Sequence, residues 1–461
     1  MNRDLESVKR GAFESPHLRT MREAFDRLAL SGVFADDPPW LVSARKRALG
    51  EFLEAGYPTT NDEAWRHTSL EKLLLQPFVV AARPGLDAGL KRLIECSAFG
   101  AVGGTRLVFA NGYFAEGLSQ GRREGDDVYV SRLYAAVRER PEIVNARCAA
   151  ESQPIQYDGR LSLLNLAFAH DGAVVVVPPN TVVQEPITVV FVSLPEVQGE
   201  TVHVRNLVVV GPQSSVTIVE HCVGLRDVFG VTNTVTDLIV GEGARVEYLK
   251  LLEEQPSRYH FGILRVELAS SADATCHSFA LGAEVNRQNI FAELTGRGVS
   301  AVFNGLYLGC GESLVDHYLC IDHAEGFCTS NEYFNGILTG RSKGVFCGRI
   351  RVRPGAQKTS AKQTNKNLLL SEQARVYTRP QLEIYADDVR CTHGATVGQL
   401  DRDALFYMRS RGLGEGTARR MLIHGFVEEI IERVLCDPAR NAIDRLVWNR
   451  IDQCEQGASA E

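Results

Sequence analysis

The chain has 461 residues, of which 44% are hydrophobic and 23% charged, and its formal net charge at pH 7 is -7. This length predicts two or three structural units or one long repeat domain, and the mildly acidic balance argues against a general nucleic-acid-binding protein. The N-terminal stretch lacks an apolar signal segment, and the longest apolar runs, such as "GAVVVVPP", are too short to span a bilayer. We therefore expect a cytoplasmic protein that binds neither nucleic acid nor membrane.

The eleven cysteines are scattered, without a CxxC motif or any other paired spacing. Cysteines of this kind in a reducing compartment are thiols, and a free cysteine behaves as a small hydrophobic residue. The sequence therefore predicts free thiols, most of them buried in structural positions.

Residues 1–100 are predicted to form an N-terminal helical domain. The segments 18–30 and 43–56 place apolar residues at helical spacing and end near glycine. Residues 101–170 are predicted to be a mixed α/β connecting region, in which "RLVFANGYFAEG" indicates a β-hairpin. Asn111 and Gly112 suit the type I′ turn that joins two alternating strands.

Residues 171–398 are predicted to form the β-helix core. Short β-rich runs alternate with turn segments such as "GPQSS", "GEGAR", "GRGVS" and "GCGES", at intervals of about thirty residues at first and about fifteen later. Such a period indicates a repeat architecture in which each coil contacts only its neighbours. A β-helix or flattened β-solenoid fits this pattern better than a sandwich, and we expect the helical zones to lie at its two ends.

Residues 399–461 are predicted to form a C-terminal helical domain. Asp401 is placed as the N-cap of a first helix, and a break at Gly412–Gly414 separates that helix from a second one. A third helix begins at Pro438, a residue favoured in the first helical turn. Along one side of the second helix we predict an apolar stripe formed by Ala418, Met421, Leu422, Gly425, Phe426 and Ile430.

The stretch "DDVRCTHGATVGQLD" holds Cys391 and His393 two residues apart. In a strand, residues i and i+2 share a face, so a thiolate and an imidazole could approach one metal ion or cluster. Two ligands do not complete a tetrahedral site, and the others would come from elsewhere in the fold, from a partner subunit, or from bound sulfide or water. The alternative is a buried cysteine beside a hydrogen-bonded histidine.

Other stretches with metal-ligating residue types are weaker candidates. The adjacent pairs at 221–222 and 276–277 would face opposite ways in a strand, and "DHYLCIDH" could place Cys320 on one face with an aspartate. The stretch "DEAWRHTSL" at 62–70 is predicted to be a loop-to-helix junction that packs Trp65. No P-loop or H-E-x-x-H sequence occurs, which argues against the enzyme classes that carry them and against a nucleotide site on this chain.

Residues 362–413, together with "DEAWRHTSLEKLL" near the N-terminus, resemble the SufB/SufD family of iron–sulfur cluster assembly scaffold proteins. The resemblance implies a mostly β chain, with a right-handed parallel β-helix core flanked by N-terminal and C-terminal helical domains. SufB-type chains carry an N-terminal cysteine-rich CxxC-like segment, which this sequence lacks. The chain is therefore similar to the SufD branch of the family.

The resemblance also implies partners. A scaffold subunit of this kind, with no catalytic activity of its own, pairs with SufB through the β-helix and holds the ABC-type ATPase SufC on the C-terminal helical domain at 399–461. A homodimer of the isolated chain is left open. We expect that removal of residues 402–461 abolishes SufC binding and leaves the β-helix folded.

The same resemblance implies a metal site. In the family, a histidine in the stretch C-[ST]-H-G-A-T-V-G, at the interface of the two paralogues, is a candidate ligand of iron or of a nascent cluster. It maps onto His393, and the preceding cysteine, which the family implicates less firmly, maps onto Cys391. The expected cofactor is a transient iron–sulfur cluster or iron at the SufB interface. Two alternatives stay open, a structural adaptor without metal contact and an intracellular β-helix enzyme.

Overall fold

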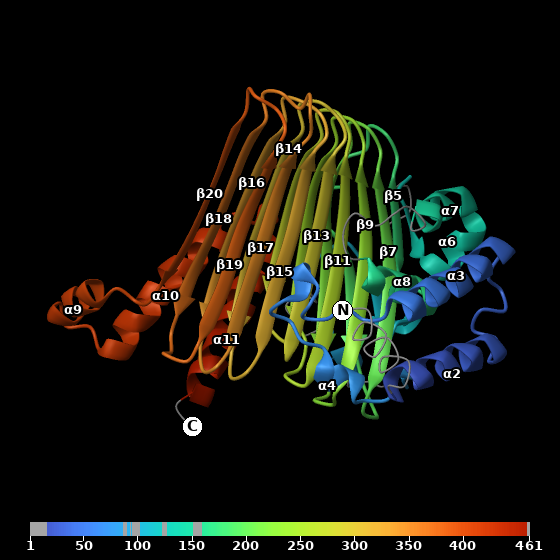
Figure 1. Cartoon of the computed structure of the whole chain (residues 1–461), viewed down its shortest axis with the longest axis horizontal. Coiled ribbons are helices and arrows are strands. Elements are labelled where there is room, and N and C mark those ends of the chain that lie inside the picture. Colours follow the sequence, from blue (N-terminus) through green and yellow to red (C-terminus); the bar gives the residue numbers. More distant parts are fainter. Residues whose placement is uncertain are drawn as a thin grey trace, which may run out of the picture.

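The computed structural model describes residues 16–85, 90–92, 94, 102–121, 127–150 and 159–458. The start of the predicted N-terminal domain, residues 1–15, lies outside the described residues. Two ten-stranded sheets form the body of the molecule, with helices on either side (Figure 1). Within the described ranges, no helix is both long enough and apolar enough to cross a membrane.

The first sheet runs in the order β19-β17-β15-β13-β11-β9-β7-β5-β4, and β1 pairs with β7 beside this path. Its strands are β1 (Val79–Val80), β4 (Tyr129–Arg132), β5 (Ala173–Val177), β7 (Glu200–Val210), β9 (Gly230–Val240), β11 (Arg258–Leu268), β13 (Val285–Leu294), β15 (Leu314–His323), β17 (Lys343–Val352) and β19 (Arg375–Ile384).

The second sheet runs in the order β20-β18-β16-β14-β12-β10-β8-β6-β2-β3. Its strands are β2 (Thr105–Ala110), β3 (Tyr113–Phe114), β6 (Ile187–Ser193), β8 (Ser215–Gly224), β10 (Arg245–Glu253), β12 (Asp273–Ala280), β14 (Ser300–Gly309), β16 (Thr329–Leu338), β18 (Ser360–Leu369) and β20 (Arg390–Gly398).

From β5 onward the chain alternates between the two sheets, and each strand pairs in parallel with the strand two positions later. Strands of the first sheet begin at Gly230, Arg258, Val285 and Leu314, so one coil takes about thirty residues. The inward-facing side chains of the two sheets meet in a shared buried cluster. The predicted β-solenoid is therefore confirmed, and the sandwich alternative is excluded.

The hairpin predicted around Asn111 is confirmed. β2 and β3 pair antiparallel, with Phe109 opposite Phe114. Asn111 and Gly112 between them have φ angles of 50° and 82°. Positive φ at both central positions is what a type I′ turn requires, and asparagine and glycine tolerate it best.

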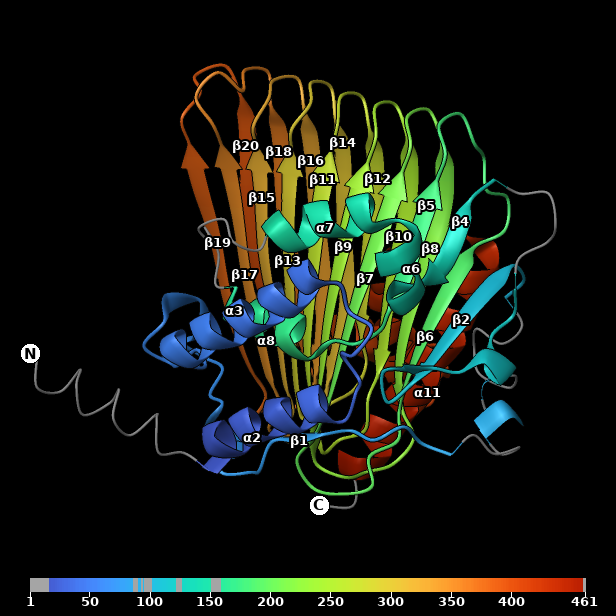
Figure 2. The ribbon, with the colours of Figure 1, turned by 90° about the vertical axis from the view of Figure 1, so that its right-hand side faces the viewer.

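Helices cover the outer face of the first sheet. They are α2 (Pro16–Leu30), α3 (Pro39–Ala55) and α8 (Arg160–Phe168), with α4 (Glu71–Leu74), α6 (Leu133–Glu139), α7 (Pro141–Ala150) and the 3₁₀ turn η1 (Glu63–Trp65) nearby. The 3₁₀ turn η2 (Glu116–Leu118) packs instead on β2 of the second sheet. Phe52 of α3 and Phe168 of α8 share one buried cluster with Leu207 of β7 and Val231 of β9. Figure 2 shows α2, α3 and α8 across the strands of this sheet.

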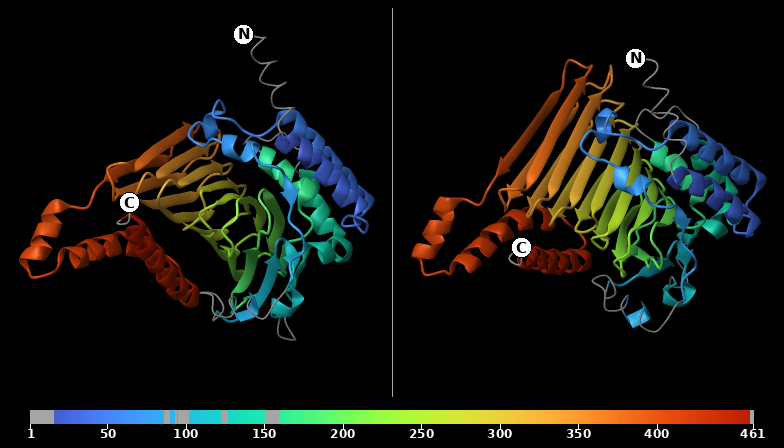
Figure 3. Two further views of the ribbon diagram at one scale, coloured as in Figure 1. Left: turned by 90° about the horizontal axis from the view of Figure 1, so that it is seen from below. Right: turned by 60° about the horizontal axis from the view of Figure 1, so that its bottom comes forward.

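The C-terminal helices lie on the opposite side, over the second sheet. They are α9 (Arg402–Ser410), α10 (Glu415–Ile431) and α11 (Asp437–Ala458). Asp401 is the N-cap of α9, as predicted, because its carboxylate accepts hydrogen bonds from two backbone N–H groups of that helix. Ile423 of α10 and Val447 of α11 pack in one cluster with Leu249 and Phe279 of the sheet. Figure 3 shows the C-terminal helices (red) on the side of the strands opposite the N-terminal helices (blue). The expectation that both helical zones lie at the solenoid ends is therefore wrong, because the apolar outer faces of the sheets need cover along their length.

The predicted stripe on α10 has the wrong register. The helix buries Ala418, Ile423, Val427 and Ile430, whereas Met421 is 49% exposed. The apolar residues of this helix are too evenly distributed around its axis for spacing alone to identify the packed side. The consequence is an exposed apolar side chain on the outward side of α10.

Candidate functional site at the open edge of the solenoid

Cys391 and His393 lie on β20, the final strand of the second sheet. Its neighbour β18 places Ala361 beside Cys391 and Gln363 beside His393. Cys391 is half-buried, and His393 is exposed. His393 is thus not a buried structural histidine, and the shared strand face predicted for the two residues is present.

His393 continues a row of inward-pointing side chains that crosses three strands. Glu332 of β16 pairs in register with Gln363 of β18, and Gln363 pairs with His393. Gln363 Nε2 donates a hydrogen bond to Glu332 Oε2 at 2.5 Å. Burial raises the pKa of Glu332 to about 8, so this carboxyl is mostly protonated at neutral pH. The imidazole therefore ends a row that is polar but largely uncharged.

Cys391 packs at the end of the solenoid interior, beside Ile350, Ala361 and Ala386. Burial raises the pKa of its thiol, and metals bind the thiolate rather than the thiol. Over the described parts of the chain, the one convergent group of three ligand side chains lies elsewhere, around His424. Among the residues that the structure describes, the β20 site therefore has two ligand types and no third protein ligand.

The backbone of β20 presents unpaired groups to solvent. Arg390 N–H donates to the Thr359 carbonyl of the preceding coil, and successive residues of a parallel strand direct their backbone groups to opposite sides. The N–H groups of Cys391, His393 and Ala395 therefore point away from β18. This edge can accept another strand.

Apolar side chains accompany this edge. Tyr377 and Ile384 of β19, Tyr385 directly after it, and Val397 of β20 are 39–59% exposed. β19 and β20 are the terminal strands of their sheets, so both exposed edges belong to the same end of the solenoid. Unpaired backbone groups and exposed apolar side chains together have the chemistry of an interaction surface.

The adjacent cysteine–histidine pairs are separated by the sheet, as expected. Cys222 and Cys276 are buried inside the solenoid, each within an apolar cluster. His221 faces outward, where its Nε2 lies 2.8 Å from Glu253 Oε2. Cys320 lies on the outer face of the first sheet among Tyr318 and Cys347. Within the described ranges, none of these residues joins a convergent group of three ligand side chains.

The stretch at 62–70 packs an aromatic residue, as predicted. Trp65 is fully buried against the first sheet, with the Arg287 guanidinium 3.9 Å from its ring centroid. Arg287 also forms an ion pair with Asp316, whose Oδ2 accepts a 2.5 Å hydrogen bond from Thr68 Oγ1. The stretch therefore fastens the N-terminal segment to β13 and β15.

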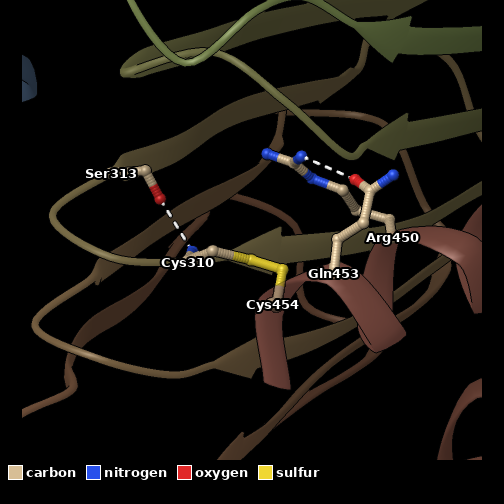
Figure 4. The surroundings of a disulfide bond; sticks show 5 residues. All are labelled: Cys310, Ser313, Arg450, Gln453 and Cys454. Atoms are coloured by element: carbon tan, nitrogen blue, oxygen red, sulfur yellow. Dashed lines mark hydrogen bonds between the residues drawn. A yellow bond between two sulfur atoms is a disulfide. The ribbon is translucent and has the colours of Figure 1, made fainter. Parts of the chain in front are cut away.

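The expectation of free thiols is wrong at one position. Cys310, at the turn after β14, forms a disulfide with Cys454 of α11, 144 residues later (Figure 4). The free thiols include Cys222, Cys276, Cys328, Cys347, Cys391 and Cys436. No spacing rule could reveal this pair, because the packing of α11 on the second sheet brings the two residues together.

Sequence comparisons place these features in a family. The N-terminal region profile of SufBD proteins matches residues 29–189, and the profile described as "SUF system FeS cluster assembly, SufBD core domain" matches residues 193–426. The second match spans the solenoid from the end of β6 through β20 and continues into α10.

Individual relatives agree with the profiles. The iron–sulfur cluster assembly protein SufD of Escherichia coli (strain K12) is 33% identical, over 83% of this chain and 87% of its own length. A SufBD family protein of Synechocystis is 30% identical over 86% of this chain and 87% of its own length. SufD of Bacillus subtilis (strain 168) is 25% identical over 90% of this chain and 95% of its own length. The chain therefore belongs to the SufB/SufD family of iron–sulfur cluster assembly proteins and is SufD-like.

Proposed function

We propose that this chain is a non-catalytic scaffold subunit that pairs with a SufB-type chain through the open edge of its solenoid. The observation that carries the proposal is that Cys391 and His393 lie on the terminal strand with their backbone N–H groups directed outward. A strand added there would bring its own side chains beside these two residues. The ligands that this chain lacks would then come from the partner.

In this assembly His393 contributes an imidazole nitrogen to iron or to a nascent cluster, which is the cargo of the complex. Neutral imidazole is a common ligand of transition metals. Cys391 has a secondary role, because its thiol must first lose a proton that burial makes harder to remove. No nucleotide chemistry is assigned to this chain, and ATP hydrolysis belongs to SufC.

The test is co-expression with SufB and SufC, followed by iron and sulfide analysis of the purified complex. His393→Ala should leave the complex assembled and its melting temperature unchanged, because the side chain is exposed, while iron and sulfide content fall. Cys391→Ala should have a smaller effect. Thr392→Ala, on the same strand with the opposite side-chain direction, is the matched control and should load normally.

Normal iron and sulfide content in the His393→Ala complex would contradict the ligand role. That result would favour the structural adaptor, in which the edge pairs with SufB but touches no metal. Loss of the complex itself would instead assign His393 to subunit pairing. The same preparations therefore separate the three roles.

SufC is proposed to bind the outward side of α9 and α10. Phe406 and Tyr407 of α9 are 75% and 58% exposed, and Met421 of α10 is 49% exposed. Removing residues 402–461 would also uncover apolar residues of the second sheet such as Leu249 and Phe279. The deletion expected to leave the β-helix intact is thus a poor test, since folding and docking would be lost together.

Substitutions on the exposed side avoid this problem. Phe406→Ser with Met421→Ser should abolish co-purification of SufC and leave the melting temperature within about 1 °C, because surface changes alter stability little. Leu435→Ser, which removes another exposed apolar side chain, after α10, serves as the control. Undiminished SufC binding by the double variant would refute this docking surface.

A further inference from the structure

A second group of metal-ligating side chains lies far from β20 in the sequence, on the C-terminal helices. His424 and Glu428 occupy positions i and i+4 of α10, so they share one side of that helix. Asp444 of α11 faces them, and one ligand atom from each residue lies within 4.8 Å of those of the other two. We propose that His424, Glu428 and Asp444 form a binding site for a divalent first-row transition metal that joins α10 to α11.

A single tryptophan orients two of the three ligands. The His424 ring stacks on Trp448, with 4.9 Å between ring centroids and 10° between ring planes. Trp448 Nε1–H also donates a hydrogen bond to Asp444 Oδ1 at 3.0 Å. This bond leaves Oδ2 of the carboxylate available to a metal. Hydrogen bonds to a metal-binding side chain fix its orientation toward the ion.

The charges around the group favour a cation. Two carboxylates converge here, and the His424 Nε2 to Glu428 Oε2 distance of 3.8 Å is too long for a hydrogen bond. The nearby Arg420 pairs with Asp452 at 3.0 Å, and its guanidinium lies 5.4 Å from the Trp448 ring centroid. The Glu428 and Asp444 carboxylates repel each other when they lie this close. A bound divalent cation would relieve that repulsion.

The donor set defines the class of metal. One imidazole nitrogen and two carboxylate oxygens suit Zn²⁺ or Fe²⁺, whereas a thiolate-preferring Cu⁺ would find no sulfur and Ca²⁺ prefers an all-oxygen shell. Three ligands from two helices leave at least one position for water. The bound ion would fix the seam between α10 and α11, beside the exposed surface proposed to receive SufC.

Trp448 provides the readout. The chain has three tryptophans, and Trp448 alone adjoins the group, so Co²⁺ binding at His424 should quench part of the emission. Titration of the metal-free full chain with Co²⁺ and with Zn²⁺, followed by fluorescence and calorimetry, gives affinity and stoichiometry. Fe²⁺ added anaerobically in competition with Co²⁺ decides which ion binds more tightly. All titrations are performed on His393→Ala protein, which removes the β20 imidazole.

His424→Ala and Asp444→Asn should each weaken Zn²⁺ binding by about 10- to 100-fold and shift the Co²⁺ quenching to correspondingly higher Co²⁺ concentrations. Asp444→Asn keeps an acceptor for Trp448 and so separates loss of a ligand from loss of packing. Glu432→Gln, on the exposed surface just after α10, should bind as well as its parent. Unchanged affinity and quenching in both ligand variants, or no saturable binding in the parent, would overturn the proposal.

Discussion

Glu332 illustrates how burial changes the chemistry of a residue. Its side chain lies inside the solenoid, where Gln363 donates a hydrogen bond to its Oε2, while its Oε1 has no hydrogen-bond partner among the described residues. Burial raises its pKa from an ordinary value of 4.5 to about 8. Between these two values the folded chain holds a proton that the unfolded chain has released, so stability falls as pH rises through this window.

Glu332→Gln should therefore flatten the pH dependence of stability. The variant should unfold at nearly the parental temperature at pH 4.5 and above it at pH 8, because it has no carboxyl to protonate. The expected difference in slope is about 1.4 kcal/mol per pH unit within the window. Denaturant unfolding at several pH values measures it, and parallel pH profiles for the parent and the variant would contradict the assignment.

Burial of a histidine changes stability with pH in the opposite direction, so that stability falls as the pH falls. Burial lowers the pKa of His317 to about 3, from 6.5, and Ser278 supplies a 3.1 Å hydrogen-bond contact at Nε2. The unfolded chain binds this proton near pH 6.5 and the folded chain does not. The stability that depends on neutral His317 is therefore fully present above pH 6.5 and is lost as the pH falls toward 3.

His317→Gln should reduce the slope of the free energy of unfolding against pH by about 1.4 kcal/mol per pH unit between pH 6 and 4. This change corresponds to the loss of about one proton taken up on unfolding. The substitution lowers stability at pH 7 because it disturbs a packed site, so the slope, not the midpoint, is the measured quantity. Phe334→Leu supplies the control, because it disturbs the ring packed beside His317 without removing a titratable group, and it should leave the slope unchanged. Equal slopes in His317→Gln and the parent would rule out this histidine as a source of acid sensitivity.

At the scale of elements, α11 connects distant parts of the chain. Its apolar residues Ile443 and Val447 cover the second sheet, and Cys454 near its C-terminal end bonds to Cys310. Cross-links that close long loops stabilise a fold mainly by restricting the unfolded chain. The helix is therefore held both by packing and by a covalent bond.

Reduction should lower the free energy of unfolding by about 2–5 kcal/mol. Cys310→Ser should show the same loss without reductant and no further loss with it. Cys436→Ser, which removes a free thiol just before α11, should remain sensitive to reductant like the parent. Denaturant unfolding with and without dithiothreitol makes the comparison, and a parental chain indifferent to reductant would mean that the bond contributes nothing to stability.

At the scale of the whole molecule, the two sides of the solenoid are covered and one end is open. N-terminal helices pack on the first sheet and C-terminal helices on the second, whereas β19 and β20 have one strand neighbour each. Uncapped parallel edges bind other strands unless charge or proline blocks them. Pro380 interrupts β19, so the edge that stays open is that of β20. The isolated chain is therefore expected to dimerise through this end.

Ala395→Pro tests the open edge. The Ala395 N–H points away from β18, so proline there removes an outward donor without breaking a bond of the ladder. Light scattering should show a monomer of parental melting temperature. Thr396→Pro is the contrasting change, because it removes a donor directed toward β18 and should lower the melting temperature. A dimer that survives Ala395→Pro would place the self-association elsewhere.

Local rules were enough for much of the fold. The Asp401 cap, the helix start around Pro438 and the turn at Asn111 and Gly112 depend on φ/ψ preferences and on hydrogen bonds a few residues apart. The period of about thirty residues identified the solenoid because every coil has the same arrangement of strands and turns and packs only on its neighbours. Strand alternation likewise placed Cys391 and His393 on one face.

Tertiary structure decided what these elements meet. The sequence pattern did not specify that helices cover the outer faces of the sheets, which side of α10 is packed, or that Cys310 reaches Cys454. The i, i+4 spacing of His424 and Glu428 is visible in the sequence, but Asp444 joins them only when α11 folds back along α10. Local periodicity determines which side of a helix or strand is apolar. Which other element packs against that side depends on the burial of apolar surface over the whole chain.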